Sequence, residues 1–170
     1  MRSTYLFTAS IFALSVAAAT AQSPVRDVAL TPEHVHWGYY DAPVAPVLRV
    51  ACGDRVRVET MDAGGLQRLR LAGATEAEIP ESLKAVEQRV VERGPGAHPM
   101  TGPIYVEGAQ PGDTLEVRIV AIEFLHNFGV NAFSPGSGVL PDEFPYQALK
   151  LMRWSAGADR VEFAPGITLP

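Results

Sequence analysis

The sequence predicts a mainly β fold, a β-sandwich or barrel-like domain with one short helix, expected to be incomplete. Three observations lead to this prediction. The 14 prolines and 15 glycines favour many turns, and therefore short strands over long helices. Several short apolar runs alternate with polar residues, which is typical of strands that bury one face. Hydrophobic residues make up 47% of the chain and charged residues 19%, as in ordinary folded domains with a core.

The first 21 residues have the pattern of a secretory signal peptide. Arg2 gives a positive start, residues 5–19 are mostly apolar and small, and Ala19-Thr20-Ala21 fits the cleavage rule. A membrane anchor is the alternative, but the apolar run is short for a span of about 20 residues. We therefore expect a signal peptide over 1–21, a β domain over 22–170, and a secreted or periplasmic protein that has no membrane contact after cleavage.

Charge and cysteine content exclude two further classes. The net charge is −5 and no basic cluster is present, so nucleic acid is not an expected partner. Cys52 is the single cysteine of the chain, so no internal disulfide can form. No histidine lies close to Cys52 in sequence, and we interpret it as a small, semi-buried residue rather than a nucleophile.

The amino-terminal third predicts an extended lead-in, a strand and a hairpin. Residues 34–41 form an aromatic-rich strand in which His34 and His36 would point the same way. Two such histidines suit two metal ligands, or one ligand and one acid–base group, although surface histidines on a half-exposed strand fit equally well. Residues 47–60 read as a hairpin that turns at Cys52-Gly53-Asp54.

The middle of the chain holds the only predicted helix, over residues 80–91. Four apolar residues recur at helical spacing and form one stripe: Ile79, Leu83, Val86 and Val90. Pro80 suits the first turn of a helix, and Gly94-Pro95 ends it. Residues 66–74 have a mixed pattern that predicts no defined element.

The densest run of turn residues is 98–113, which also carries His98, Glu107 and Asp113. It predicts a strand over 104–106, a turn over 110–113 closed by Asp113, and a second strand over 114–121. An aromatic loop follows from residue 124, and strands are expected over 149–154 and 161–163. The last residues, 164–170, read as a loop without a closing element.

Several motifs of this chain resemble the acetamidase/formamidase family. HPMTGPIYVEGAQPGDTLEVRI (98–119) is similar to the centre of that family, and HVHWGYYDAPVAPVLRVACGDRVRVET (34–60) is similar to its amino-terminal segment. FGVNAFSPGSGVLPDEFPY and the final FAPGITLP also resemble family segments. The resemblance implies β-sandwich and barrel architecture and hydrolysis of small linear amides, such as formamide and acetamide, to the acid and ammonia.

The resemblance also implies a division of the site. Family members are longer, and their carboxy-terminal half carries a Gly-Gly-Asn motif and an acidic, His-containing stretch linked to metal binding. This chain ends before both, so the main ligands of a divalent metal, zinc in the first place, are expected outside it. Within the chain we expect His98 and Glu107 as proton carriers or ligands, Thr101 and Asn131 as groups that orient the amide, and His36 as a metal ligand.

Two other functions fit the same patterns. One is an exported β-sandwich that binds a small ligand without catalysis, or an inactive remnant of an amidase. The other is a copper-type electron carrier, which is disfavoured because no histidine or methionine follows Cys52 at ligand spacing. In either the enzyme or the binding protein, unpaired strand edges would favour a homo-oligomer.

Overall fold

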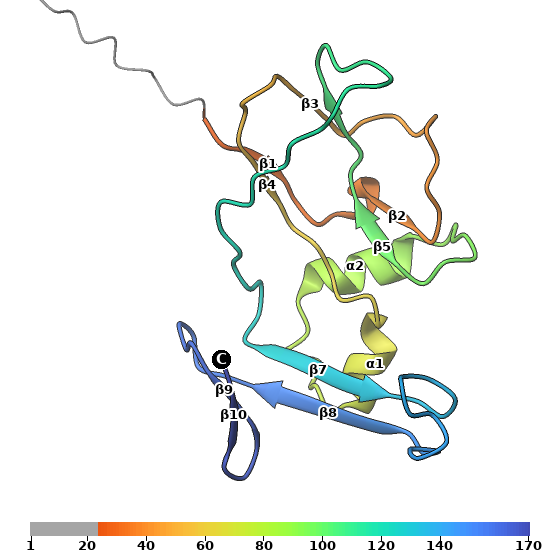
Figure 1. Cartoon of the computed structure of the whole chain (residues 1–170), viewed down its shortest axis with the longest axis vertical. Helices are drawn as coiled ribbons and strands as arrows, with labels where there is room; N and C mark the ends of the chain where they lie inside the picture. Colours follow the sequence, from red (N-terminus) through yellow and green to blue (C-terminus); the bar gives the residue numbers. More distant parts are fainter. Residues whose placement is uncertain (1–23) are drawn as a thin grey trace, which may run out of the picture.

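The computed structural model describes residues 24–170, which form short strands and two helices connected by long loops (Figure 1). The predicted signal peptide lies outside these described residues. Within them, no helix has both the length and the apolar character that a membrane span requires. The mainly β prediction is confirmed, with no closed barrel among the described strands.

The strands form five separate two-stranded ribbons in the described part of the chain. Two ribbons are parallel: β1 (Arg26–Val28) with β4 (Val56–Val58), and β3 (Leu48–Val50) with β6 (Ile104–Val106). Three are antiparallel: β2 (Val35–Trp37) with β5 (Pro99–Thr101), β7 (Phe128–Phe133) with β8 (Ala148–Arg153), and β9 (Val161–Ala164) with β10 (Ile167–Leu169).

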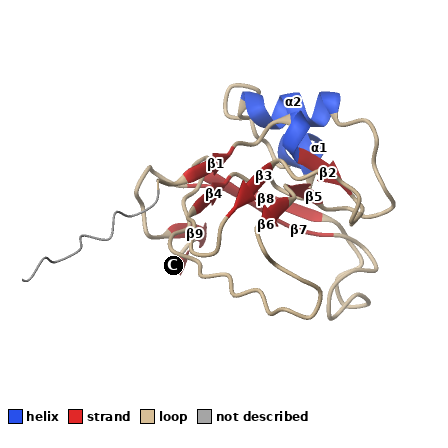
Figure 2. Cartoon of the chain, turned by 90° about the horizontal axis from the view of Figure 1, so that it is seen from above, coloured by secondary structure: helices blue, strands red, loops and turns tan. Residues whose placement is uncertain are grey.

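Both helices lie on one side of the strands (Figure 2). The predicted helix is confirmed as α2 (Glu81–Arg89), with Pro80 at its N-cap. A second helix, α1 (Gly65–Leu71), occupies the stretch for which the sequence predicted no element. It has only two buried leucines, Leu66 and Leu69, so its apolar periodicity is too short to be recognised from sequence.

The core lies between the helices and strands β2 and β7. All four residues of the predicted stripe are buried in it, and Val86 is fully inaccessible. Its other members come from most of the chain: Leu30, Val35, Trp37, Leu66, Leu69, Ala74 and Phe128. The helical stripe therefore supplies the surface on which the amino-terminal strand β2 and the later strand β7 meet.

The predicted hairpin over 47–60 is wrong in its pairing. The turn itself forms, because the Ala51 N–H donates to Asp54 Oδ2 over 3.0 Å and the Asp54 N–H donates to the Ala51 carbonyl over 3.2 Å. The two arms, β3 and β4, nevertheless pair with β6 and β1. Both partners run parallel to them and are reached by long connections, which the local alternation of polar and apolar residues does not specify.

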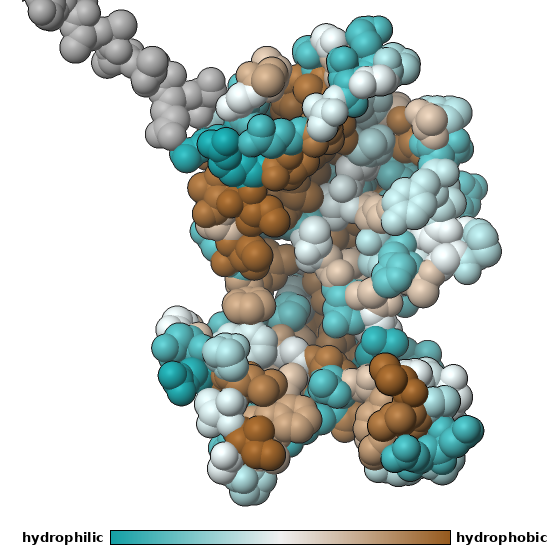
Figure 3. Space-filling view, in the orientation of Figure 1, coloured by the Kyte–Doolittle hydropathy of each residue, from teal (hydrophilic) through white to brown (hydrophobic). Residues whose placement is uncertain are grey.

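The predicted strand over 114–121 is also wrong. The segment has no strand partner among the described residues, and Leu115, Val117 and Ile119 are 67%, 75% and 74% exposed. Glu116 Oε1 lies 3.0 Å from Arg118 Nη2, so alternate side chains share one side, as in extended chain. The pattern therefore predicted the local conformation, but a strand also needs a neighbour. In Figure 1 the segment is the loop that leads from β6 to β7, and Figure 3 shows a hydrophobic area over its course.

Three smaller expectations also need correction. His34 ends a 3-10 helix, η1 (Pro32–His34), so of the two histidines only His36 lies on a strand. Cys52 is exposed on its turn rather than semi-buried. The final loop contains β10, which pairs with β9. The strands predicted over 149–154 and 161–163 are confirmed as β8 and β9.

Candidate functional site

The β2–β5 ribbon brings three of the predicted site residues together. His36 in β2 is paired with Met100, and Thr101 at the end of β5 is paired with Val35. His98 immediately precedes β5, and its carbonyl accepts a 2.9 Å hydrogen bond from the Gly38 N–H. His36, His98 and Thr101 therefore lie on one ribbon, although His36 is 62 residues away from His98 and 65 away from Thr101 in sequence.

The loop before His98 is fixed to β2 by several contacts. The Trp37 indole N–H donates to the Ala97 carbonyl over 3.2 Å, and the Gly94 N–H donates to the Trp37 carbonyl over 2.8 Å. The guanidinium of Arg93 lies 3.8 Å from the centre of the Trp37 ring. Both the backbone and the ring of Trp37 therefore contact the loop that leads to His98. These contacts fix the position of that loop relative to β2.

His36 has an unusual environment for a half-buried histidine. Its Nε2 is inaccessible and has no hydrogen-bond partner, and its ring meets the Tyr39 ring edge to face at a centroid distance of 6.1 Å. An inaccessible ring nitrogen without a partner costs stability, because its desolvation is not compensated. Such a nitrogen is chemically suited to bind a ligand atom or a metal ion.

The described residues do not fit a complete metal centre. Among residues 24–170 no group of three or more His, Cys, Asp or Glu side chains lies close enough to hold a metal ion. His36 could supply one ligand, whereas a protein zinc site needs at least three. The described residues therefore do not by themselves complete a zinc site.

Glu107 lies on a different ribbon. It directly follows β6, and its N–H donates to the Val50 carbonyl of β3 over 2.7 Å. Its carboxylate pairs with Arg49 in β3, with Nε–Oε1 at 2.6 Å and Nη2–Oε2 at 3.3 Å. The hydrogen bond from Arg49 lowers the pKa of Glu107 and raises that of Arg49. Glu107 is therefore a carboxylate at neutral pH, suited to stabilise positive charge, and its lowered pKa makes it a weaker proton acceptor.

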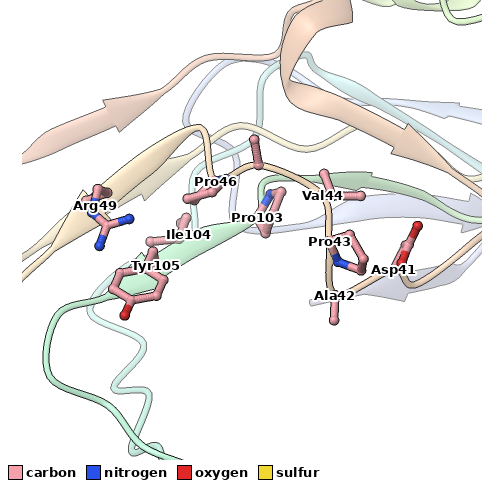
Figure 4. Close-up of a pocket in the computed structure, with 10 residues that line it drawn as sticks. Asp41, Ala42, Pro43, Val44, Pro46, Arg49, Pro103, Ile104 and Tyr105 are labelled. Atoms are coloured by element: carbon pink, nitrogen blue, oxygen red, sulfur yellow. The ribbon is translucent and has the colours of Figure 1, made fainter.

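A shallow pocket of about 380 Å³ lies beside this ion pair (Figure 4). The Arg49 guanidinium lies 3.9 Å from the centre of the Tyr105 ring at one end, and Asp41 lies at the other. Between them the lining is mostly proline and small apolar residues: Ala42, Pro43, Val44, Ala45, Pro46, Pro103 and Ile104. The sequence analysis missed this pocket, since only the parallel pairing of β3 with β6 brings Arg49 beside Tyr105.

Asn131 lies on a third ribbon. It is an exposed residue of β7, paired with Lys150 of β8. Figure 1 shows β3 near the top of the molecule, β2 and β5 in the middle, and β7 and β8 at the bottom. The five predicted site residues thus occupy three ribbons: His36, His98 and Thr101 on one, and Glu107 and Asn131 each on another.

The fold and motifs define a mainly β protein whose candidate site is divided among short ribbons. The acetamidase/formamidase family model matches residues 26–170, and the chain belongs to this family. A comparison with curated proteins found no match. The solved acetamidase of Bacillus halodurans is 27% identical with a TM-score of 0.58, and the match covers 86% of this chain and 42% of that one.

A second solved structure is similar to the same extent. The predicted acetamidase/formamidase of Thermoanaerobacter tengcongensis is 26% identical with a TM-score of 0.53, and the match covers 86% of this chain and 43% of that protein. The chain therefore spans less than half the length of either relative.

Proposed function

We propose that this chain takes part in the hydrolysis of small linear amides, of the formamide and acetamide type, with release of ammonia. The family match over residues 26–170 is the observation that carries the proposal. The names of the two similar solved proteins are consistent with it. An exported protein, secreted or periplasmic, is part of the same proposal and rests on the signal-peptide pattern of residues 1–21.

Amide hydrolysis sets the chemical demands on the site. The amide carbonyl is a poor electrophile and the amine a poor leaving group, so the reaction needs an activated water, stabilisation of the developing oxyanion and a proton for the amine. Imidazole side chains suit proton transfer near neutral pH, and His36 and His98 are the two histidines that the β2–β5 ribbon brings together. In this proposal they carry protons on the β2–β5 ribbon, and the Thr101 hydroxyl orients the amide by a hydrogen bond.

Glu107 takes the part of an electrostatic group, a carboxylate that stabilises positive charge, rather than an acid. The Arg49 hydrogen bond lowers its pKa, which keeps the carboxylate ionised at neutral pH. Asn131 would offer its amide to the substrate from β7. A divalent metal, when bound, would polarise the carbonyl and lower the pKa of a bound water. His36 is the described residue that could serve as one of its ligands.

Ammonia release from formamide and acetamide by the purified chain tests the proposal. We expect His98→Ala and Glu107→Gln to lower kcat by about 100-fold or more, as for loss of a positioned acid or base or of a charge that stabilises the transition state, without lowering the thermal midpoint equally. Glu92→Gln, a change at another exposed glutamate, is the matched control and should leave the rate unchanged. Absence of ammonia release with either amide would overturn hydrolysis as the function of this chain.

A second function is favoured by the pocket of Figure 4. The pocket has Arg49 at one end, Asp41 at the other and a mostly apolar lining between them. It suits a small ligand whose anionic group shares Arg49 with Glu107, and binding there needs no metal. Calorimetric titration with acetate and with acetamide distinguishes the two functions. Binding of acetate that is lost in Arg49→Met, together with no ammonia release, would favour the non-catalytic protein.

A further inference from the structure

Arg93 lies between α2 and β5, and its side chain is anchored to the end of that helix. Its Nε donates to the Val90 carbonyl and its Nη2 to the Glu87 carbonyl, both over 3.0 Å, and its Nη1 lies 3.5 Å from Glu87 Oε1. Glu87 belongs to the last turn of α2, and Val90 is its C-cap. A cation is favoured at this end of a helix, because the last carbonyls point outward there.

The same guanidinium restrains the indole of Trp37. It lies 3.8 Å from the centre of the ring, which is a cation–π contact. Trp37 belongs to the hydrophobic core and is 6% exposed. A ring that is packed in the core and also contacts an anchored cation has little room to turn about its side-chain bonds. Arg93 therefore helps to determine the direction in which the indole N–H points.

The direction of that N–H affects the backbone at His98. The indole donates over 3.2 Å to the carbonyl of Ala97, which belongs to the peptide group directly before His98. The Gly38 N–H donates over 2.9 Å to the His98 carbonyl, in the peptide group directly after it. Because peptide groups are planar, fixing the two that flank a Cα atom fixes the direction of its side chain. One of these two restraints depends on Trp37.

We propose that Arg93 is a positioning residue for His98, which it aligns through the Trp37 indole. The proposal rests on the proposed amide hydrolysis, in which His98 carries a proton. A guanidinium suits this position because its planar fork donates to two carbonyls while its face lies on an aromatic ring. A lysine could keep a positive charge near the ring but could not reproduce the planar fork.

Ammonia release by Arg93→Met, which keeps a long unbranched side chain, tests the kinetic consequence. We expect kcat to fall about tenfold and KM to stay within about twofold, because a misplaced proton carrier weakens the transition state more than substrate binding. Arg93→Lys should recover part of the lost kcat. Arg70→Met removes an exposed arginine that pairs with Glu76 and is the matched control, with kcat unchanged.

A double-mutant cycle distinguishes positioning of His98 from a general structural role. In a His98→Ala chain, Arg93→Met should lower kcat no further, because the group that Arg93 aligns is already absent. Two independent effects would instead multiply. The same fold loss of kcat with and without His98 would therefore overturn the proposal.

Nuclear magnetic resonance separates failure of this inference from failure of the amide chemistry. The imidazole C–H signals of His98, identified by their loss in His98→Ala, should shift in Arg93→Met and in Arg93→Lys but not in Arg70→Met. The Gly38 amide should also exchange faster in both Arg93 variants. Unmoved His98 signals in whichever of the two variants folds overturn the proposal. Shifted signals in a chain that releases no ammonia support the alignment of His98 and overturn only the hydrolysis.

Discussion

Arg153 in β8 joins the β7–β8 ribbon to the connection between α1 and α2. Its Nε lies 2.5 Å from Glu78 Oε1, and its Nη2 donates to Glu78 Oε2 over 3.0 Å and to the Gly73 carbonyl over 2.8 Å. Glu78 also accepts hydrogen bonds of 2.8 Å from the backbone and the hydroxyl of Thr75. One carboxylate thus organises the loop after α1 and anchors β8 to it.

Glu78 should make the free energy of unfolding decrease in acid. The hydrogen bond from Arg153, followed by those from Thr75, lowers the pKa of Glu78 to about 2. The carboxyl group of a glutamate in an unfolded chain has a pKa of about 4.3. At Glu78 the folded chain therefore binds a proton less readily than the unfolded chain does. The stabilisation is therefore complete above about pH 4.3 and is lost as the pH falls towards about 2.

Thermal midpoints at about pH 7 and about pH 3 check this prediction. Glu78→Gln should lower the midpoint at the higher pH and should reduce the difference between the two. Glu162→Gln, at an exposed position of β9, should leave both values as they are. An unchanged pH dependence in Glu78→Gln would show that other carboxylates determine acid stability.

Leu83 in α2 should be essential for stability. It is 1% exposed in the core, and truncation of a buried leucine costs about 2–5 kcal/mol of unfolding free energy. Leu71 at the end of α1 is 65% exposed and provides the matched control. We expect Leu71→Ala to change the unfolding free energy by no more than about 0.5 kcal/mol. Denaturant unfolding of the two variants measures both values, and equal losses would contradict the assignment of the core.

Gly38 should be required for the loop that carries His98. Its φ is +81°, and a Cβ there would lie 2.8 Å from the Gly94 carbonyl oxygen and still closer to that of Gly96. Gly53 has a similar φ of +88° but open space around it. Gly53→Ala should therefore cost only the backbone strain, about 1–2 kcal/mol, and Gly38→Ala distinctly more.

Amide exchange offers a second readout of the Gly38 change. The Gly38 N–H donates to the His98 carbonyl, and the Gly96 N–H donates to the Gly38 carbonyl, both over 2.9 Å. In Gly38→Ala these hydrogen bonds should open and both amides should exchange faster. Equal destabilisation by the two glycine changes would mean that the close approach of the 94–96 loop has no energetic role.

His36 should be replaceable without loss of stability. Its Nε2 is inaccessible and has no hydrogen-bond partner. Replacing such a side chain by an apolar one of similar shape leaves the free energy of unfolding nearly unchanged or raises it. We therefore expect His36→Phe to unfold at the same or a higher denaturant concentration than the unmodified chain. If it also lowers amide turnover, His36 is retained for function. A clear loss of stability would instead indicate a hydrogen-bonding role.

Local features of the fold could be predicted from the sequence, and pairings could not. The α2 stripe from Ile79 to Val90 and the short strand 104–106 were correctly predicted, because spacing and turn residues determine them. The partners of β3 and β4 were not predicted, since parallel pairing depends on residues far along the chain. The segment 114–121 has the alternation of a strand, but within the described residues it has no neighbour to make it one.

The candidate site shows the same division. The motif around His98 and Glu107 was recognised from its residues, and the family match agrees with it. The ion pair of Glu107 with Arg49, the pocket beside it and the unpaired nitrogen of His36 all depend on contacts across ribbons. No local pattern in the sequence carries that information, so these features could be found only in three dimensions.

The ribbon partners also determine the order in which the chain can fold during synthesis. β2 and β3 are made early, but their partners β5 and β6 come from residues 99–106. Until the ribosome has released those residues, the amino-terminal strands have nothing to pair with, whereas β7 and β8 are close in sequence and can pair soon after they emerge. The nascent chain therefore exposes β2 and β3 unpaired until residues 99–106 have emerged, and during that interval its unpaired strand edges are open to aggregation.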